Sequence, residues 1–186
     1  LLLYGMGEKV IRQLIDRMAA GEALHEIRDL RGICYLCTQD EIPANSVSCA
    51  SFRKVAENKE SYAKAHQIQN EWQDAVYGKI IVQKQTDREY LVQNPPMPTL
   101  TREELDEVFR LPFTRTYHPS YEKLGGVDAI KEVEFSIMQN RGCFGNCNFC
   151  AITFHQGRQV VSRSEESILQ EAEEMTRNPH FKGYIH

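Results

Sequence analysis

Residues 141–150 read RGCFGNCNFC and place Cys143, Cys147 and Cys150 within eight positions. Thiolates are the ligands that iron-sulfur clusters need, and three of them leave one iron of a four-iron cluster without a protein ligand. A ferredoxin-type segment would supply a fourth cysteine, whereas residues 151–154 are Ala-Ile-Thr-Phe. An open iron can bind a small molecule through its heteroatoms. The spacing therefore predicts a three-cysteine [4Fe-4S] site on a glycine-containing loop.

The segments on either side of the cysteines predict one β/α unit. Residues 133–138 alternate in hydrophobicity, which indicates a strand leading into the cysteines. Ser162 and Glu165 form a capping-box pattern ahead of an apolar stripe with helical spacing, so we expect a helix there. Residues 181–185 read as the next strand. This order of strand, loop, helix and strand is typical of a parallel sheet with helical crossovers.

The first half of the chain predicts a separate α/β domain. Residues 1–4 and 32–37 read as strands, for which we expect parallel pairing, and an amphipathic helix lies between them. Residues 55–76 carry one helical stripe, which indicates one long helix or two helices joined near Asn58. Residues 79–93 predict a hairpin.

A proline-rich stretch at residues 94–98 marks a boundary, because proline lacks the amide donor and restrains its neighbours. Thr101 with Glu104 forms a capping box, which predicts a short helix after the boundary. The predicted fold class is α/β. We expect an N-terminal α/β domain at residues 1–94, a proline-rich and loop-rich connection at 95–131, and a cysteine-bearing segment at 132–186.

The composition narrows the classes of protein. The chain has 186 residues with 41% hydrophobic and 26% charged content, and no apolar run approaches the ~20 residues of a membrane span, so a globular protein without a membrane segment is expected. A net charge of -4 disfavours nucleic acid as a partner. Six cysteines without a signal-peptide pattern indicate a reducing compartment, and we expect the cytoplasm.

The cysteine segment resembles the CxxxCxxC signature of the radical S-adenosylmethionine (radical SAM) superfamily, in which an aromatic residue, here Phe149, precedes the third cysteine. More narrowly, residues 141–153, 155–158 and 162–168 resemble the YgiQ-like radical SAM proteins. Shorter stretches of the second half, such as residues 90–96, share this resemblance, and the first half matches that family's N-terminal domain more loosely.

The resemblance implies that Cys143, Cys147 and Cys150 bind a [4Fe-4S] cluster whose fourth iron chelates S-adenosylmethionine. One electron, from a reductase or a flavodoxin-type donor, then cleaves the sulfonium and yields a 5'-deoxyadenosyl radical. Phe149 would lie near the adenine. Three further residues after the cysteines are candidate cofactor contacts or, equally, structural residues: Arg158, Arg163 and Ser164. The sequence assigns no catalytic residue, and the substrate is unknown.

The resemblance also implies that residues 132–186 begin a partial radical SAM (β/α) barrel. A six-unit barrel needs roughly 190 residues, against the 55 present in this segment. The first residue is Leu, and the last residues read as a strand. We therefore expect a truncated piece of a longer enzyme, with catalysis belonging to the parent protein and none in the fragment itself.

The alternative for the three cysteines is a structural zinc site in a non-catalytic protein, completed by His155 or by Cys34 and Cys37. Cys34 and Cys37 form a CxxC, but residues three apart in a strand point to opposite faces, which favours core packing. Residues 5–7, Gly-Met-Gly, lack the third glycine of a dinucleotide fingerprint and indicate a tight turn. The first domain is similar to cobalamin-type domains, yet no DxHxxG-type histidine is present, so cobalamin binding is not inferred.

Overall fold

The computed structural model describes residues 1–145, 147 and 149–186, and its fold is mixed α/β as predicted. The chain forms two compact units. Unit 1 consists of Leu1–Thr99 and Gly142–Gln159, and unit 2 of Leu100–Arg141 and Val160–His186. The domain boundaries predicted from the sequence, after residues 94 and 131, stay a prediction.

Unit 1 is built on a five-stranded sheet with the order β1-β2-β5-β4-β3. Its strands are β1 (Leu2–Leu3), β2 (Ile33–Cys37), β3 (Val47–Cys49), β4 (Ile81–Lys84) and β5 (Tyr90–Gln93). The β4–β5 pair is the predicted hairpin, which is confirmed. β3 pairs parallel with β4, and the other neighbours are antiparallel. The sheet is therefore mixed.

The predicted parallel pairing of the first two strands is wrong, because β1 and β2 run antiparallel with Leu2 opposite Cys34. The ladder continues through the Tyr4 amide, which donates to the Gly32 carbonyl at 2.9 Å. Gly32 has φ +71, a left-handed conformation open to glycine, and this turn sets the direction in which the chain enters β2.

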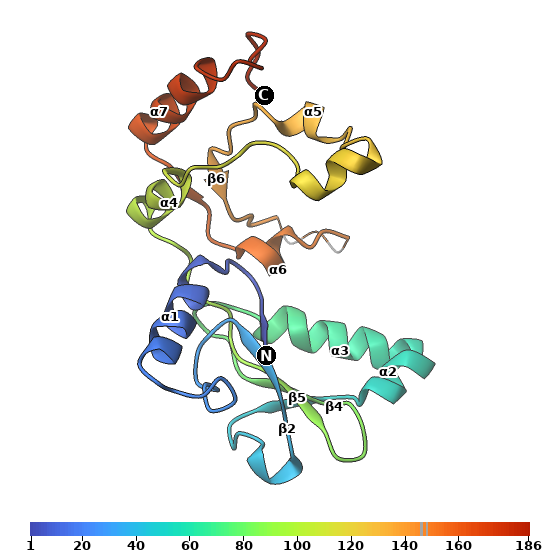
Figure 1. Ribbon diagram of the computed structural model, residues 1–186. Coiled ribbons are helices and arrows are strands. Elements are labelled where there is room, and N and C mark those ends of the chain that lie inside the picture. The colour runs from blue at the N-terminus through green and yellow to red at the C-terminus, as the bar shows by residue number, and fades with distance from the viewer. Residues whose placement is uncertain (146, 148) are drawn as a thin grey trace. The chain divides into compact units, whose positions relative to one another are not determined.

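The main buried cluster of unit 1 lies on one face of the sheet. Alternate residues of β2 point into it, and α1 (Glu8–Ala19) adds Val10 from above that face. The buried cluster comprises Val10, Ile33, Tyr35, Cys37, Val82 and Val92. Each valine or isoleucine of this cluster contributes about 1.5–3 kcal/mol through its burial. Figure 1 shows α1 on one side of the sheet and α3 on the other.

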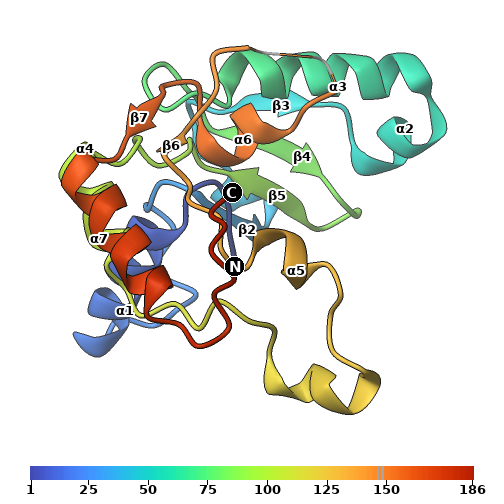
Figure 2. The same ribbon diagram turned by 90° about the horizontal axis from the view of Figure 1, so that it is seen from above.

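The long helical stripe of unit 1 forms two helices, α2 (Phe52–Glu57) and α3 (Lys59–Trp72), which meet at Asn58 as one of the two predicted alternatives. Asn58 has ψ 119, which interrupts the helix, and its side chain accepts the Ser61 amide at 2.8 Å to cap α3. Figure 2 shows α3 running along the β3 side of the sheet. Unit 1 also contains a short 3-10 helix (Gln39–Glu41) and α6 (Ile152–Gln156).

Unit 2 begins with α4 (Arg102–Phe109), and the predicted capping box is confirmed. The Thr101 amide donates to Glu104 at 2.8 Å, and the Glu104 amide donates to the Thr101 hydroxyl at 3.3 Å. The remaining elements are a 3-10 helix (Pro119–Leu124), α5 (Ile130–Val133), a two-stranded antiparallel sheet of β6 (Asn140–Arg141) and β7 (Val161–Ser162), and α7 (Glu165–Thr176).

The capping box predicted from Ser162 and Glu165 is wrong. Ser162 belongs to β7, and Ser164 caps α7 by accepting the Ser167 amide at 3.1 Å. Both serines lie shortly before Glu165 and Glu166, so the sequence alone offers either serine as the cap. Strand pairing of Ser162 with Asn140 excludes it from the cap and leaves that position to Ser164.

The strand predicted at residues 133–138 is wrong, because Val133 ends α5 and the Ser136 hydroxyl and amide both donate to the Val133 carbonyl. These local bonds favour a helical turn at the start of the segment. Further on, the His186 amide donates to the Phe135 carbonyl at 2.9 Å and the Ile137 amide donates to the His186 carbonyl at 2.8 Å, so the segment bonds to the end of the chain without forming a strand. The strand predicted at 181–185 is also wrong: the Phe181 amide closes a turn on Asn178, and Gly183 has φ +90.

Candidate metal centre

The two ends of the cysteine loop are held together within unit 1. The Cys143 amide donates to the Gly157 carbonyl at 3.1 Å, and the Gly142 amide donates to Oε1 of Gln156 at 3.1 Å. Gly142 and Gly157 have φ of 92 and 83, so both adopt conformations that glycine enters without strain. Helix α6 lies between the last cysteine and Gly157. This stem fixes the backbone from which Cys143 projects.

Two of the three thiols converge on Gly145. The Gly145 amide donates to Sγ of Cys143 at 3.4 Å, and Sγ of Cys147 approaches the Gly145 carbonyl at 3.7 Å. A Cβ at this position would lie 3.3 Å from the first sulfur and 3.7 Å from the second. The absence of a side chain on Gly145 therefore keeps the space beside both sulfurs open, which fits a group bound by these thiols.

Cys150 follows in a turn, since its amide donates to the Cys147 carbonyl at 3.0 Å. Cys147 is exposed, and Cys143 and Cys150 are half-buried. Among residues 1–145, 147 and 149–186, no three His, Cys, Asp or Glu side chains lie close enough together to hold a metal ion. In particular, the three cysteines form no such group with one another or with His155, a fourth ligand suggested for zinc.

Two aromatic residues of the loop face solvent. Phe144 is 86% exposed and Phe149 is 92% exposed. Side chains of this exposure gain little burial energy where they lie. Phe149, the residue expected near an adenine, is therefore sterically free to stack on a planar ligand.

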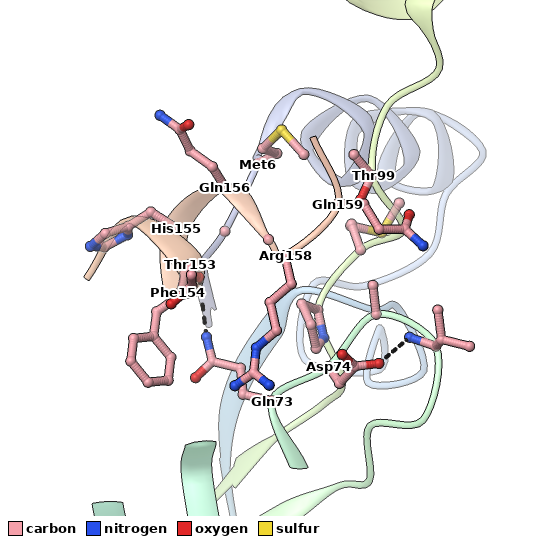
Figure 3. A pocket seen from close by; sticks show the side chains of 16 residues that line it. Met6, Gln73, Asp74, Thr99, Thr153, Phe154, His155, Gln156, Arg158 and Gln159 are labelled. Carbon is pink, nitrogen blue, oxygen red and sulfur yellow. Dashed lines mark hydrogen bonds between the residues drawn. The ribbon is translucent and has the colours of Figure 1, made fainter. Parts of the chain in front are cut away.

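Arg158 follows the stem, and its side chain points toward the end of α3, beside Gln73 and Asp74 (Figure 3). Its Nη2 donates to the Asn70 carbonyl at 2.7 Å and to Oδ1 of Asn70 at 2.9 Å. Nε2 of Gln73 donates to the carbonyl of Phe154 in α6 at 3.2 Å. These bonds attach the segment after the cysteines to α3.

Arg163 and Ser164 lie in unit 2, where each has structural partners. Arg163 is 4% exposed, donates to Ser167 and Glu171, and stacks over the Phe109 ring at 4.1 Å. The Ser164 amide donates to Asp106 at 3.0 Å. Burial opposes ionisation of Asp106, but the Ser164 side chain and amide bonds keep its pKa below the usual value. These contacts favour the structural alternative for both residues, and their role as cofactor contacts stays a prediction.

Cys34 and Cys37 occupy opposite faces of β2. Cys37 belongs to the core cluster with Tyr35, whereas Cys34 lies on the other face with exposed Leu36. Burial raises the pKa of the Cys34 thiol to about 11 and raises the pKa of Cys37 as well. Thiols held in the protonated form are poor metal ligands, which agrees with core packing.

Sequence reasoning missed Asn70, Gln73 and Gln156, which connect the cysteine segment to the rest of unit 1. The first two are polar residues near the end of an amphipathic helix, and nothing in that pattern distinguishes them from solvated positions. The left-handed glycines at 142 and 157 were the available signal for a closed stem around Gln156.

In the part of the chain that the structure describes, helices are too short or too polar to traverse a bilayer.

The chain is a mixed α/β protein with a three-cysteine loop, and comparison with known families shows which family it belongs to. The family model described as radical SAM N-terminal matches residues 1–136, so the chain belongs to the radical SAM N-terminal family. The match ends before the cysteines. No solved structure matches the chain significantly.

Curated relatives extend across the cysteines. The chain is 51% identical over 186 residues to a UPF0313 protein of Clostridium botulinum, strain ATCC 19397, and 50% identical over 187 residues to a UPF0313 protein of Clostridium perfringens, strain 13. Both alignments cover all of this chain but only 29% and 28% of the relatives. The chain thus spans less than a third of the length of the proteins that it resembles.

Proposed function

We propose that the protein to which this chain belongs is a radical SAM enzyme that binds a [4Fe-4S] cluster through Cys143, Cys147 and Cys150. The observation that carries the proposal is the convergence of two thiols on Gly145, in a loop that also supplies a third thiol and no fourth. Membership of the radical SAM N-terminal family supports it. The resemblance of the cysteine segment to YgiQ-like proteins supports a narrower assignment to that group.

When bound, such a cluster supplies the electron that cleaves S-adenosylmethionine to methionine and a 5'-deoxyadenosyl radical. The residues of this chain hold and shape the site. Gly145 leaves room beside the sulfurs, and the stem bonds of Gly142 and Cys143 hold the first ligand in place. Phe149 offers an exposed ring to the adenine.

Hydrogen abstraction belongs to the longer protein in this proposal, because the chain covers 29% of its relatives and a β/α barrel needs more strands. We infer a cytoplasmic location, where a reductase or flavodoxin-type protein would deliver the electron. Arg158, Arg163 and Ser164 remain candidate cofactor contacts, and their observed partners make them weaker candidates than Phe149.

Anaerobic reconstitution with iron and sulfide tests the cluster. We expect about four irons per chain and the broad visible absorption of a [4Fe-4S] cluster. Tight stoichiometric zinc in the purified protein, with no iron uptake after its removal, would instead establish the non-catalytic zinc protein. The catalytic half of the proposal is tested with dithionite and S-adenosylmethionine: 5'-deoxyadenosine should form with the longer protein and not with this chain alone.

A further inference from the structure

We propose that Asn70 is a positioning residue for the cysteine loop and acts through Arg158. The inference rests on the proposed function of the loop, but the contacts that carry it exist without a metal. Asn70 lies in the last turn of α3, where backbone carbonyls have no partner within the helix. A guanidinium that binds such a carbonyl satisfies it and also interacts favourably with the negative end of the helix dipole.

The connection from Asn70 to the first cysteine has three steps. Nη2 of Arg158 binds both the carbonyl and the Oδ1 of Asn70, at 2.7 and 2.9 Å. Gly157, the residue before Arg158, accepts the Cys143 amide at 3.1 Å. Because consecutive residues share a planar peptide, fixing Arg158 restricts the Gly157 carbonyl and hence the backbone of Cys143.

A second bond holds the same segment from the other side. Gln73, which follows α3, donates Nε2 to the Phe154 carbonyl at 3.2 Å. Phe154 lies in α6, whose last residue, Gln156, accepts the Gly142 amide at 3.1 Å. The segment that follows the cysteines is thus attached to the end of α3 at two points, and Gly142 and Cys143 are held to that segment through Gln156 and Gly157.

The cavity at this junction supports positioning over ligand binding. It encloses about 50 Å³, which is room for water molecules and not for a nucleotide. Asp74 accepts the amides of Tyr77 and Val76 at 2.9 and 2.7 Å, and these bonds with the nearby Arg158 charge keep its pKa below the usual value. Asp74 therefore has its partners beside it in the protein (Figure 3), and Arg158 has its partner in Asn70.

The consequence is that the α/β unit sets the geometry of the first ligand. Loosening Arg158 should leave all three thiols available, so the cluster still forms, but Cys143 should be held less firmly. We expect faster loss of iron to a chelator and an altered EPR spectrum of the reduced cluster, without loss of the fold.

The variants are Asn70→Ala, which removes Oδ1 and keeps the carbonyl, Arg158→Ala, which removes both bonds, and Arg158→Lys, which keeps a cation. The matched control is Asn58→Ala, which removes the cap at the opposite end of the same helix. It destabilises α3 without touching the junction, so it separates general weakening of the helix from positioning.

Hydrogen exchange of the Cys143 amide, measured by NMR on the metal-free whole chain, is the first readout. A bond to a charged group contributes enough that Arg158→Ala should accelerate this exchange about tenfold, with smaller effects of Asn70→Ala and partial rescue by Arg158→Lys. Asn58→Ala should change it no more than it changes neighbouring amides. Iron release and the EPR spectrum, measured on reconstituted protein, should follow the same order.

Unchanged Cys143 exchange in folded Arg158→Ala would overturn the inference, as would equal effects of Asn58→Ala and Asn70→Ala. If Arg158→Ala does not fold, the same comparison is made with Asn70→Ala and Arg158→Lys. If no variant, nor the parent chain, takes up iron, the proposed function fails while the amide exchange still decides whether Asn70 positions the loop.

Discussion

The chain contains two sets of closely spaced cysteines in opposite surroundings. Cys34 and Cys37 lie in a strand, on opposite faces of a sheet, one of them within the core. Cys143 and Cys147 lie in a loop, where both sulfurs approach one glycine. The backbone makes the difference, because a strand separates residues three apart while a glycine turn brings neighbouring thiols together. Spacing in the sequence therefore identifies ligands only when the conformation between them is known.

Removing the thiols one at a time is the strongest test of this difference between the two sets of cysteines. Alanine at Cys143, Cys147 or Cys150 should abolish iron binding, so that the iron content falls from about four irons per chain to almost none. The loop has three cysteines and no fourth that could replace a lost ligand. Alanine at Cys34 should leave the iron content unchanged. Iron assay and visible spectra of the reconstituted variants are the measurement. Full iron in all three loop variants would refute the assignment of the loop.

The two regions should also differ in stability. Ile33 has no exposed surface and sits in the core beside β5, so Ile33→Ala should lower the free energy of unfolding by about 2–5 kcal/mol. Phe149 is 92% exposed, so Phe149→Ala should change it by no more than about 0.5 kcal/mol. Urea titrations followed by circular dichroism compare the two. Similar losses would mean that the loop is packed as firmly as the sheet.

Metal binding should make the cysteine loop more ordered and so reduce the difference in amide exchange between the loop and the sheet. Phe144 and Phe149 bury little surface, so the cysteine loop has few contacts to offset its conformational entropy, and ligation should supply the ordering energy. Amides of Cys143, Gly145 and Cys150 should exchange more slowly in reconstituted than in metal-free protein. Sheet amides such as that of Val92 should exchange equally in both. Equal protection of the loop in the two states would show that it is ordered before metal binds.

The smallest expected effect is a change in how the free energy of unfolding depends on pH in the alkaline range. Burial raises the pKa of Cys34 from 9.0 to about 11, so the folded state favours the neutral thiol. The resulting stability is present in full below pH 9 and declines as the pH rises through about 11. Cys34→Ala should therefore lose less stability than the parent chain between these values, as urea titrations at several pH values would show. Cys37 and Cys49 titrate in the same direction, so the decline should persist in part. Parallel profiles would indicate that Cys34 is solvated.

Local signals predicted the fold best. The capping box of Thr101 and Glu104, the break at Asn58 and the hairpin turn between β4 and β5 each depend on residues within a few positions of one another. The pairing direction of β1 was predicted wrongly because it depends on how Gly32 turns the chain, and on β5, which pairs with the other edge of β2. Such contacts across distant segments leave no periodic trace in the sequence.

The same distinction applies to the candidate site. The cysteines and their glycines are contiguous, so their chemistry was readable directly. The attachment through Asn70 joins residues 88 positions apart, and an asparagine near a helix end resembles a solvated residue. At residues 133–138 a contiguous pattern gave a wrong prediction. The alternation of apolar residues suits a strand, but Ser136 bonds back to Val133 at the end of a helix.

Unit 1 is discontinuous along the chain: Gly142–Gln159 returns to it after the excursion of Leu100–Arg141 into unit 2. During synthesis the sheet strands leave the ribosome long before Arg158 does, so α3 is made without its partner at Asn70. Closing the intervening segment carries an entropy cost that grows slowly with its length, and this cost falls on the last step of assembling unit 1. All strands of the sheet are thus synthesised before the residues that form the stem of the cysteines, which makes the stem the last part of unit 1 to become available for assembly.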